Sequence, residues 1–173
     1  MIQPEIDLLV LGMGGTIDKD YPRSTMGYAF EIDEPAAERI LAAMPFCSLR
    51  WSIQSICKKD STEINDRDRE LLVEAIRSTT ASKVLVTHGT DTMIETAQFV
   101  KRSRASASCA VAFTGAMKPE RFYDSDATFN VGVAVGALGL ISQGEVVVCM
   151  GGKVLEASKC VRDLTTGLFN DSS

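Results

Sequence analysis

The sequence has 173 residues, with 18 lysines and arginines against 23 aspartates and glutamates, a formal net charge of −5 and an isoelectric point near 4.9. Its 45% of apolar and 24% of charged residues are typical of a globular protein that buries a core, which excludes disordered and collagen-like chains. Because binding to phosphates needs clustered positive charge, the acidic balance and the lack of a Lys- and Arg-rich segment argue against nucleic acid as a partner.

Five segments with the apolar character of strands alternate along the chain with four segments of helical spacing. The strands are expected at 7–13, 49–54, 83–87, 110–113 and 146–150, and the helices at 35–44, 66–76, 93–102 and 127–141. Asn65 and Asp126 are expected N-caps, and Gly151 and Gly152 predict a hairpin after the last strand. The alternation predicts an α/β fold, a single three-layer domain over residues 1–173 with a mainly parallel, doubly wound sheet.

Two connecting features bear on function. The segment 17–33 shows no clear period and is expected to be a long loop, which in compact domains often carries function. Residues 49–54 alternate apolar and polar side chains, which indicates a strand with one wetter face, at an edge of the sheet.

The cysteines and the N-terminal segment bear on the compartment. The cysteines are odd in number and never form a C-x-x-C pair, which fits neither a disulfide framework nor a zinc ribbon and favours a reducing cytosol. The first ten residues lack a basic start, and no run approaches the ~18 apolar residues of a membrane helix. We therefore expect a cytoplasmic protein without a signal peptide or membrane span. The five cysteines are Cys47, Cys57, Cys109, Cys149 and Cys160.

Residues suited to chemistry collect after the predicted strands. In open parallel sheets, ligands bind outside the carboxyl ends of the strands. In any single loop, hydroxyl, carboxylate and glycine residues are common as helix caps and turns. Their recurrence at four strand ends favours a site at this edge. The residues are Gly14, Gly15 and Thr16; Asp60 and Ser61; His88, Gly89, Thr90, Asp91 and Thr92; and Thr114 and Gly115.

His88 is the single histidine of the chain. This count excludes H-E-x-x-H zinc sites, two-histidine metal triads and any Ser-His-Asp triad not built on that residue. Between a buried strand and a glycine, His88 fits a hydrogen-bonded structural group better than a general base. A hydroxyl nucleophile here therefore needs a lysine or a tyrosine as its base. Backbone N–H groups of Gly15 and Thr16, or of Gly89 and Thr90, are candidate donors to an oxyanion.

Three segments of the chain resemble signature motifs of the bacterial-type L-asparaginases. They are Gly14-Gly15-Thr16-Ile17, residues 87–97 (THGTDTMIETA) and residues 114–119 (TGAMKP). The resemblance extends from the first strand to about Leu155, but it corresponds only to the N-terminal domain of those two-domain enzymes. It implies an amidohydrolase that uses two threonines and needs no metal or organic cofactor.

The resemblance also implies roles for individual residues. Thr16 is similar to the family nucleophile, which attacks the side-chain amide carbonyl and forms an acyl-enzyme ester, and Thr90 resembles the second catalytic threonine. The α-ammonium of the substrate would contact Asp91, and the Asp60-Ser61 loop would receive the α-carboxylate. The substrate-binding residues implied in this way are Asp60, Ser61, Gly89 and Asp91.

A tyrosine and a lysine complete the family's site. The tyrosine lies in the loop after the first motif, where Tyr28 is at about the family distance and Tyr21 is nearer, so both are candidates. The lysine works with the second threonine. Lys159 is the candidate for it, reached by opening a gap after Val154-Leu155, and Lys153 and Arg162 are its alternatives.

The expected function is hydrolysis of L-asparagine to L-aspartate and ammonia. Glutamine is an expected second substrate, because discrimination of one methylene gains only ~1–3 kcal/mol. The C-terminal domain that closes the site in the resembled enzymes is absent, so we expect a homo-oligomer in which another copy covers the site. Two alternatives stay open: a catalytically weak module that binds or senses acidic amino acids, and an amidase for a larger amide.

Overall fold

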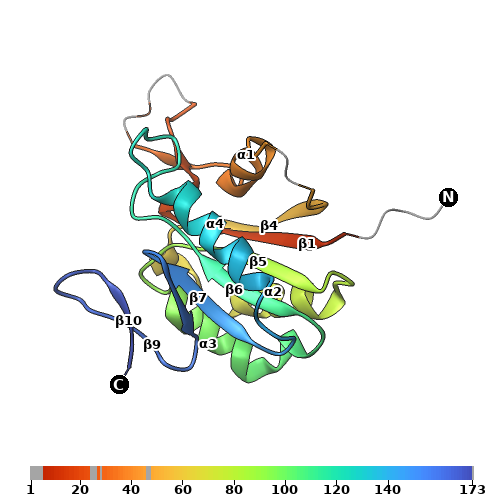
Figure 1. Cartoon of the computed structure of the whole chain (residues 1–173). Coiled ribbons are helices and arrows are strands. Elements are labelled where there is room, and N and C mark those ends of the chain that lie inside the picture. Colours follow the sequence, from red (N-terminus) through yellow and green to blue (C-terminus); the bar gives the residue numbers. More distant parts are fainter. Residues whose placement is uncertain (1–5, 24–26, 28, 46–47, 173) are drawn as a thin grey trace.

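The computed structural model describes residues 6–23, 27, 29–45 and 48–172. A six-stranded sheet runs through the molecule in the order β4-β1-β5-β6-β7-β8 (Figure 1). The first five of these strands pair in parallel, and β8 returns antiparallel to β7. Their bounds are β1 Leu8–Gly14, β4 Trp51–Lys59, β5 Lys83–Thr87, β6 Ala110–Thr114, β7 Val146–Met150 and β8 Lys153–Glu156.

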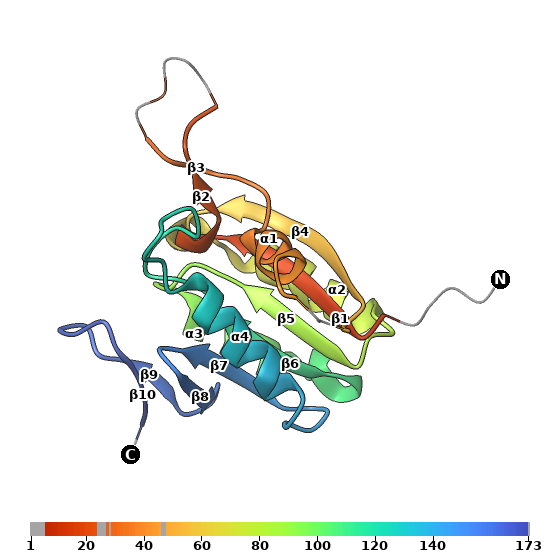
Figure 2. The ribbon, with the colours of Figure 1, turned by 45° about the horizontal axis from the view of Figure 1, so that its top comes forward.

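Helices cover both faces of the sheet, as Figure 2 shows. One apolar cluster joins α1 and α4 to one face, and a second joins α2 and α3 to the other. Because alternate side chains of a strand point to opposite faces, Leu85 of β5 belongs to the first cluster, whereas Val84 and Val86 belong to the second. The structure thus confirms the predicted α/β fold. The helices are α1 Ala36–Ala42, α2 Asp66–Ser78, α3 Met93–Ser103 and α4 Ala127–Leu138.

Several predicted boundaries need correction. The edge strand is predicted correctly, but β4 continues to Lys59, which pairs with Gly14 beyond a bulge. Helix α4 ends at Leu138 rather than at 141, because Gly139, a weak helix former, is its C-cap. Asp126 is the N-cap residue of α4, as predicted, but its side chain makes no capping hydrogen bond. Its carboxylate instead accepts hydrogen bonds from the backbone N–H groups of Met117 and Lys118.

Two small hairpins extend from the carboxyl-end side of the sheet. The first is formed by β2 (Lys19–Asp20) and β3 (Glu31–Ile32), within the segment predicted as a long loop. The second is formed by β9 (Cys160–Arg162) and β10 (Phe169–Asp171), which the sequence analysis missed. The predicted turn at Gly151 and Gly152 is present and connects β7 to β8.

Short 3₁₀ helices follow β1, β4 and α3, at Thr16–Asp18, Ser61–Glu63 and Ala105–Ser108. Within the described ranges, no helix combines the length and apolar character that crossing a bilayer requires. The described cysteines, Cys57, Cys109, Cys149 and Cys160, are free thiols, and Cys47 lies outside the described residues.

Candidate active site

The end of β1 makes a tight turn against the loop that follows β5. Gly14 and Gly15 have φ angles of 87° and 89°, a region that side chains other than glycine rarely adopt. A Cβ atom on Gly15 would lie 2.3 Å from the backbone N and Cα of Gly89. Gly15 therefore permits direct contact between the turn after β1 and the loop after β5, whereas a Cβ atom on Gly14 would lie 2.6 Å from the backbone N and O of Lys59 in β4. Thr16 follows at once, half-buried, as the first residue of a 3₁₀ helix.

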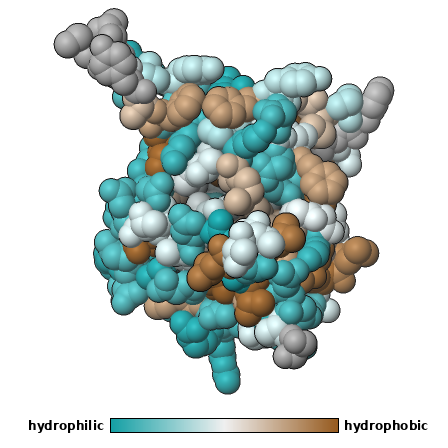
Figure 3. All heavy atoms as spheres, turned by 90° about the vertical axis from the view of Figure 1, so that its left-hand side faces the viewer, coloured by the Kyte–Doolittle hydropathy of each residue, from teal (hydrophilic) through white to brown (hydrophobic). Residues whose placement is uncertain are grey.

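The loop after β4 joins the same cluster. A Cβ atom on Gly89 would lie 2.7 Å from Oγ of Ser61, and the Thr92 hydroxyl donates a hydrogen bond of 2.7 Å to the Ser61 carbonyl. Residues adjacent to Thr16 and Thr90 are thus in contact, with Ser61 packed against them. Figure 3 shows this side of the molecule, toward which the parallel strands run in Figure 1.

A buried hydrogen-bond chain supports the Gly89–Thr90 segment from beneath. His88 Nδ1 lies 2.7 Å from the Gly89 carbonyl, and Nε2 lies 2.9 Å from the hydroxyl of Thr96. The Thr96 hydroxyl also accepts from Arg69 Nε at 3.2 Å. Because a carbonyl only accepts and an arginine only donates, Nδ1 carries the proton and the Thr96 hydroxyl donates to Nε2.

Burial keeps the His88 imidazole neutral. Burial lowers the pKa of His88 to about 4, and the imidazole has both nitrogens engaged. His88 is therefore a structural group, as the sequence analysis favours. Arg69 and Thr96 were missed, because only the fold brings α2 and α3 to the end of β5.

Asp60 shapes its loop rather than facing the site freely. Its carboxylate accepts hydrogen bonds from the backbone N–H and the hydroxyl of Thr62, which caps the 3₁₀ helix that begins at Ser61. The first of these bonds is the largest cause that lowers the pKa of Asp60. The other oxygen of the carboxylate lies 3.5 Å from Nζ of Lys19. Lys19, which the sequence analysis did not name, thus adds a cation beside the predicted carboxylate-binding loop.

Asp91 has a cationic partner from the far end of the chain. Arg162 Nη1 donates to Asp91 Oδ1 at 2.7 Å, and the arginine side chain is 19% exposed against 57% for Asp91. The guanidinium carbon lies 5.6 Å from the ring centroid of Phe169, its cross-strand partner in the β9–β10 hairpin. The site therefore contains an arginine that pairs with Asp91, the residue that follows Thr90 in the sequence.

The structure does not bring Lys159 to this edge, so its assignment as the base lysine needs correction. The backbone N–H of Ala157 donates to the carbonyl of Val146, at the start of β7. Lys159 follows Ala157 at this amino-terminal end of β7, where its side chain is 60% exposed and pairs with Glu156 at 3.3 Å. The physical reason is that β8 runs antiparallel and carries the chain away from the carboxyl ends.

Lys153 is one of the two alternatives to Lys159 for the base lysine. It pairs with Met150 at the carboxyl end of β7, the end at which the site lies. Its ammonium donates to the Phe169 carbonyl and the Asn170 side chain, at 3.2 and 2.6 Å. It therefore braces the β9–β10 hairpin.

Of the two candidate tyrosines, the structure describes the position of Tyr21 only. Tyr21 is 65% exposed, and its ring lies 5.3 Å from that of Phe30, so it lies at the surface of the segment after β2. Tyr28 lies outside the described residues.

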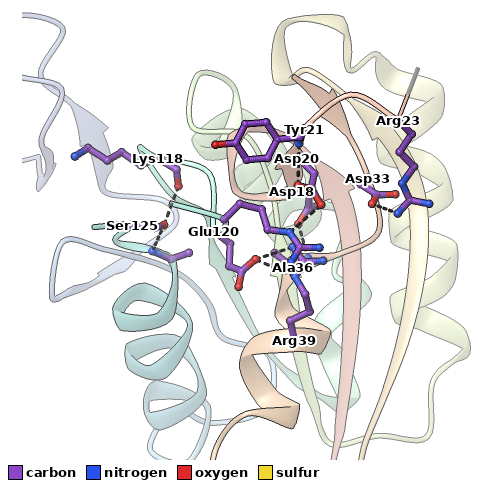
Figure 4. Close-up of polar contacts among 12 residues, drawn as sticks. Asp18, Asp20, Tyr21, Arg23, Asp33, Ala36, Arg39, Lys118, Glu120 and Ser125 are labelled. Carbon is purple, nitrogen blue, oxygen red and sulfur yellow. Dashed lines mark hydrogen bonds and ion pairs between the residues drawn. The ribbon is translucent and has the colours of Figure 1, made fainter. Parts of the chain in front are cut away.

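A buried carboxyl group lies two residues beyond Thr16. Asp18 is 1% exposed, and its Oδ1 accepts a 2.7 Å hydrogen bond from the backbone N–H of Ala36 at the start of α1. Figure 4 shows this contact beside the ion pair of Arg39 with Glu120. Burial raises the pKa of Asp18 to about 7. The carboxyl group thus ties the nucleophile loop to α1, a role that the sequence analysis missed.

Among the described residues, no group of three or more His, Cys, Asp or Glu side chains could hold a metal ion. The chemistry assembled here is that of hydroxyls, carboxylates, two cations and backbone donors.

Comparison with known proteins identifies the family of this chain. Residues 7–169 match the family model "Asparaginase, N-terminal". Over 168 residues the chain is 29% identical to a "Probable L-asparaginase periplasmic" of Haemophilus influenzae, covering 94% of this chain and 48% of that protein. It is 25% identical over 173 residues to a "Glutaminase-asparaginase" of Acinetobacter glutaminasificans, covering 94% and 50%.

The solved structures give the same picture. The thermostable L-asparaginase from Thermococcus kodakarensis superposes with a TM-score of 0.76 at 25% identity, over 95% of this chain and 50% of that one. The chain thus spans about half the length of the relatives it matches. On these grounds the chain belongs to the asparaginase family, to whose N-terminal domain its residues 7–169 correspond.

Proposed function

We propose that this protein hydrolyses the side-chain amide of L-asparagine to L-aspartate and ammonia, with Thr16 as the nucleophile. The observation that carries the proposal is the contact of Gly15 with Gly89. It sets the loop of Thr16 against the loop of Thr90, with Ser61 packed beside them. A small polar substrate at this edge can meet two hydroxyls and several backbone N–H groups at once.

The reaction proceeds through an ester. The Thr16 oxygen attacks the amide carbon, its proton passes through a tyrosine hydroxyl to the leaving nitrogen, and ammonia departs. Tyr28 and Tyr21 are the candidates for this tyrosine. Water then attacks the ester carbon, which releases L-aspartate and returns the proton to Thr16. Backbone N–H groups of the two contacting loops stabilise the oxyanion, an effect commonly worth ~10²–10³ in rate per donor.

Charged groups orient the substrate. Asp91 holds the α-ammonium. The α-carboxylate binds at the Asp60-Ser61 loop, and because Asp60 is itself an anion, the Ser61 hydroxyl and the Lys19 ammonium beside Asp60 are the groups that attract it. L-Glutamine, one methylene longer, is a weaker substrate of the same site.

Closure of the site by a second copy of the chain is part of this proposal. Asp91 is 57% exposed, and water at an open site weakens electrostatic stabilisation of the transition state. A closed homo-oligomer would remove that water. Light scattering on the active protein gives its mass, and a fully active monomer would contradict this part.

The test is ammonia release from L-asparagine, L-glutamine and a peptide amide at millimolar concentration. Thr16→Ala should abolish release while keeping the fold, as checked by circular dichroism. Thr80→Ala, which alters an exposed threonine before β5 at the other end of the sheet, is the matched control and should retain full activity. Undiminished release by Thr16→Ala would refute the assignment of the nucleophile.

A second candidate function is binding or sensing of an acidic amino acid. It is favoured by Arg162, because the cation found next to Asp91 is an arginine rather than a lysine that could act as a base. Saturable binding of L-aspartate without ammonia release from any amide would support this alternative.

A further inference from the structure

The β9–β10 hairpin is built to hold one arginine in place. The Asp163 carboxylate accepts hydrogen bonds from the backbone N–H groups of Thr165 and Thr166, and Gly167 turns the chain with a φ angle of 75°. The hairpin closes with Arg162 paired across from Phe169. These contacts within the hairpin hold the strand that carries Arg162 without any contribution from the site.

The guanidinium is anchored on both sides. It lies against the Phe169 ring and donates to Asp91 at 2.7 Å. Its Nε atom is buried and, within the described part of the chain, has no hydrogen-bond partner. Leaving a buried donor unpaired costs ~1–3 kcal/mol. The position of the Arg162 side chain is therefore set by its contacts with Asp91 and the Phe169 ring, and not by hydrogen bonding of all its donors.

Arginine and lysine differ in the one property that matters here. A guanidinium stays protonated in proteins and has no lone pair to accept a proton, whereas a partly buried lysine amine can lose its proton and act as a base. The family resemblance implies a lysine that works with the second threonine. In the described structure, the cation that contacts Asp91 is Arg162, and Lys159 lies at the other end of β7.

We infer that Arg162 serves in place of the base lysine as a positioning residue: it orients Asp91 for the substrate ammonium and accepts no proton, so it does not act as a base for Thr90. This inference rests on the proposed function. Its consequence is that Thr16 and its tyrosine carry the proton transfers alone. A lysine at position 162 would restore a base beside Thr90.

Two substitutions separate positioning from proton transfer. Arg162→Lys keeps the positive charge and adds a group that can lose its proton. It should raise kcat about 100- to 1,000-fold, the lower part of the range for general base catalysis, and add an ionisation to the alkaline side of the pH profile. Arg162→Met removes the contact to Asp91 and should raise KM, and the Kd for L-aspartate, at least about tenfold, with little change in kcat.

The matched control is Arg67→Lys, on the exposed face of α2, where the Arg67 side chain forms an ion pair with Glu70 at 3.6 Å. It should leave kcat, KM and the pH profile as in the wild type. Thermal unfolding of each variant shows whether the hairpin change has affected the fold. If Arg162→Met does not fold, Arg162→Gln, which keeps a polar side chain, is measured in its place.

The outcomes distinguish this inference from the proposed function. If Arg162→Lys equals the wild type in kcat at every pH, or if Arg162→Met binds L-aspartate as tightly as the wild type, the inference is overturned. Activity in Arg162→Lys but not in the wild type supports the inference and overturns the proposed activity of the natural chain. If neither releases ammonia, the proposed function fails, and isothermal titration with L-aspartate on wild type and Arg162→Met still decides the positioning role.

Discussion

Replacing Thr96 by valine is the sharpest test of the hydrogen-bond chain beneath the site. Thr96 is fully buried and links Arg69 Nε to His88 Nε2 through one hydroxyl. Valine has nearly the same shape, so the substitution removes the hydroxyl without opening a large cavity. The imidazole nitrogen then loses its donor and the Arg69 Nε–H loses its acceptor.

The cost follows from these two lost contacts. A buried polar group left without a partner costs ~1–3 kcal/mol. The other nitrogens of Arg69 keep their contacts to Asp66 and Glu95, at 3.0 and 3.1 Å, so the arginine is not released to solvent. The free energy of unfolding should therefore fall by about 2–6 kcal/mol. For a chain of this size, at about 2–4 °C per kcal/mol, that is a decrease in Tm of roughly 4–24 °C.

The control is Thr96→Ser, which keeps the hydroxyl and loses one methyl group, worth about 1 kcal/mol. Urea unfolding at pH 7.5, followed by the fluorescence of the single tryptophan Trp51 and by circular dichroism, measures both variants. At this pH His88 is neutral in the folded protein and largely neutral in the unfolded chain, so no proton uptake confuses the comparison. A serine variant as unstable as the valine variant would refute the role of the hydroxyl.

Two further predictions concern the nucleophile loop. Asp18→Asn keeps an oxygen for the Ala36 N–H and removes the titrating carboxyl group. In the folded wild type the pKa of Asp18 is about 7, above the ordinary 3.8. The stability that protonated Asp18 contributes is therefore fully present below pH 3.8 and is lost as the pH rises to 7. The variant's advantage should thus grow across pH 4–7, to roughly 4 kcal/mol at ~1.4 kcal/mol per pKa unit, and urea unfolding that shows a constant difference would contradict this. Gly15→Ala should cost over ~3 kcal/mol and abolish ammonia release, because of strain and the 2.3 Å approach to Gly89. Gly144→Ala, with a similar φ of 87° but open space around it, should cost only about 1 kcal/mol, so equal losses in thermal unfolding would show that the close approach is unimportant.

The elements of the fold were predictable because their signals are local. Buried strands such as β5 are continuous apolar runs, and helices such as α2 begin with a cap that can be recognised in the sequence. Asn65 accepts from the N–H groups of Arg67 and Asp68, and the Asp68 carboxylate accepts from the Asn65 N–H. The alternation of such elements leaves few ways to form the sheet.

The glycine contacts of the site were predictable for a related reason. Gly15 and Gly89 follow strands that are neighbours in the sheet, so their loops had to meet at the same edge. Only the distance of approach required the structure.

The charged groups were not predictable, because their partners are remote in sequence. Arg162 and Asp91 are separated by 71 positions, and the hairpin that joins them has strands of three residues, too short for a period to show. The gap that selected Lys159 assumed that the chain continues toward the site after Leu155, whereas β8 leads it away. The burial of Asp18 likewise depends on α1 and on the loop of Glu120, and neither is adjacent to it in sequence.

The two halves of the site are therefore fixed by different physics. The hydroxyl half depends on backbone contacts that tolerate only glycine at positions 15 and 89, so any change there affects the fold itself. The charged half depends on side chains of the separate β9–β10 hairpin. There, an arginine can replace a lysine without changing the position of any strand. Relatives at 25–29% identity can thus share the fold while the residues that transfer protons differ. If Arg162 has the positioning role proposed for it, then the residue at this position, and not family membership alone, determines how protons are transferred in this chain.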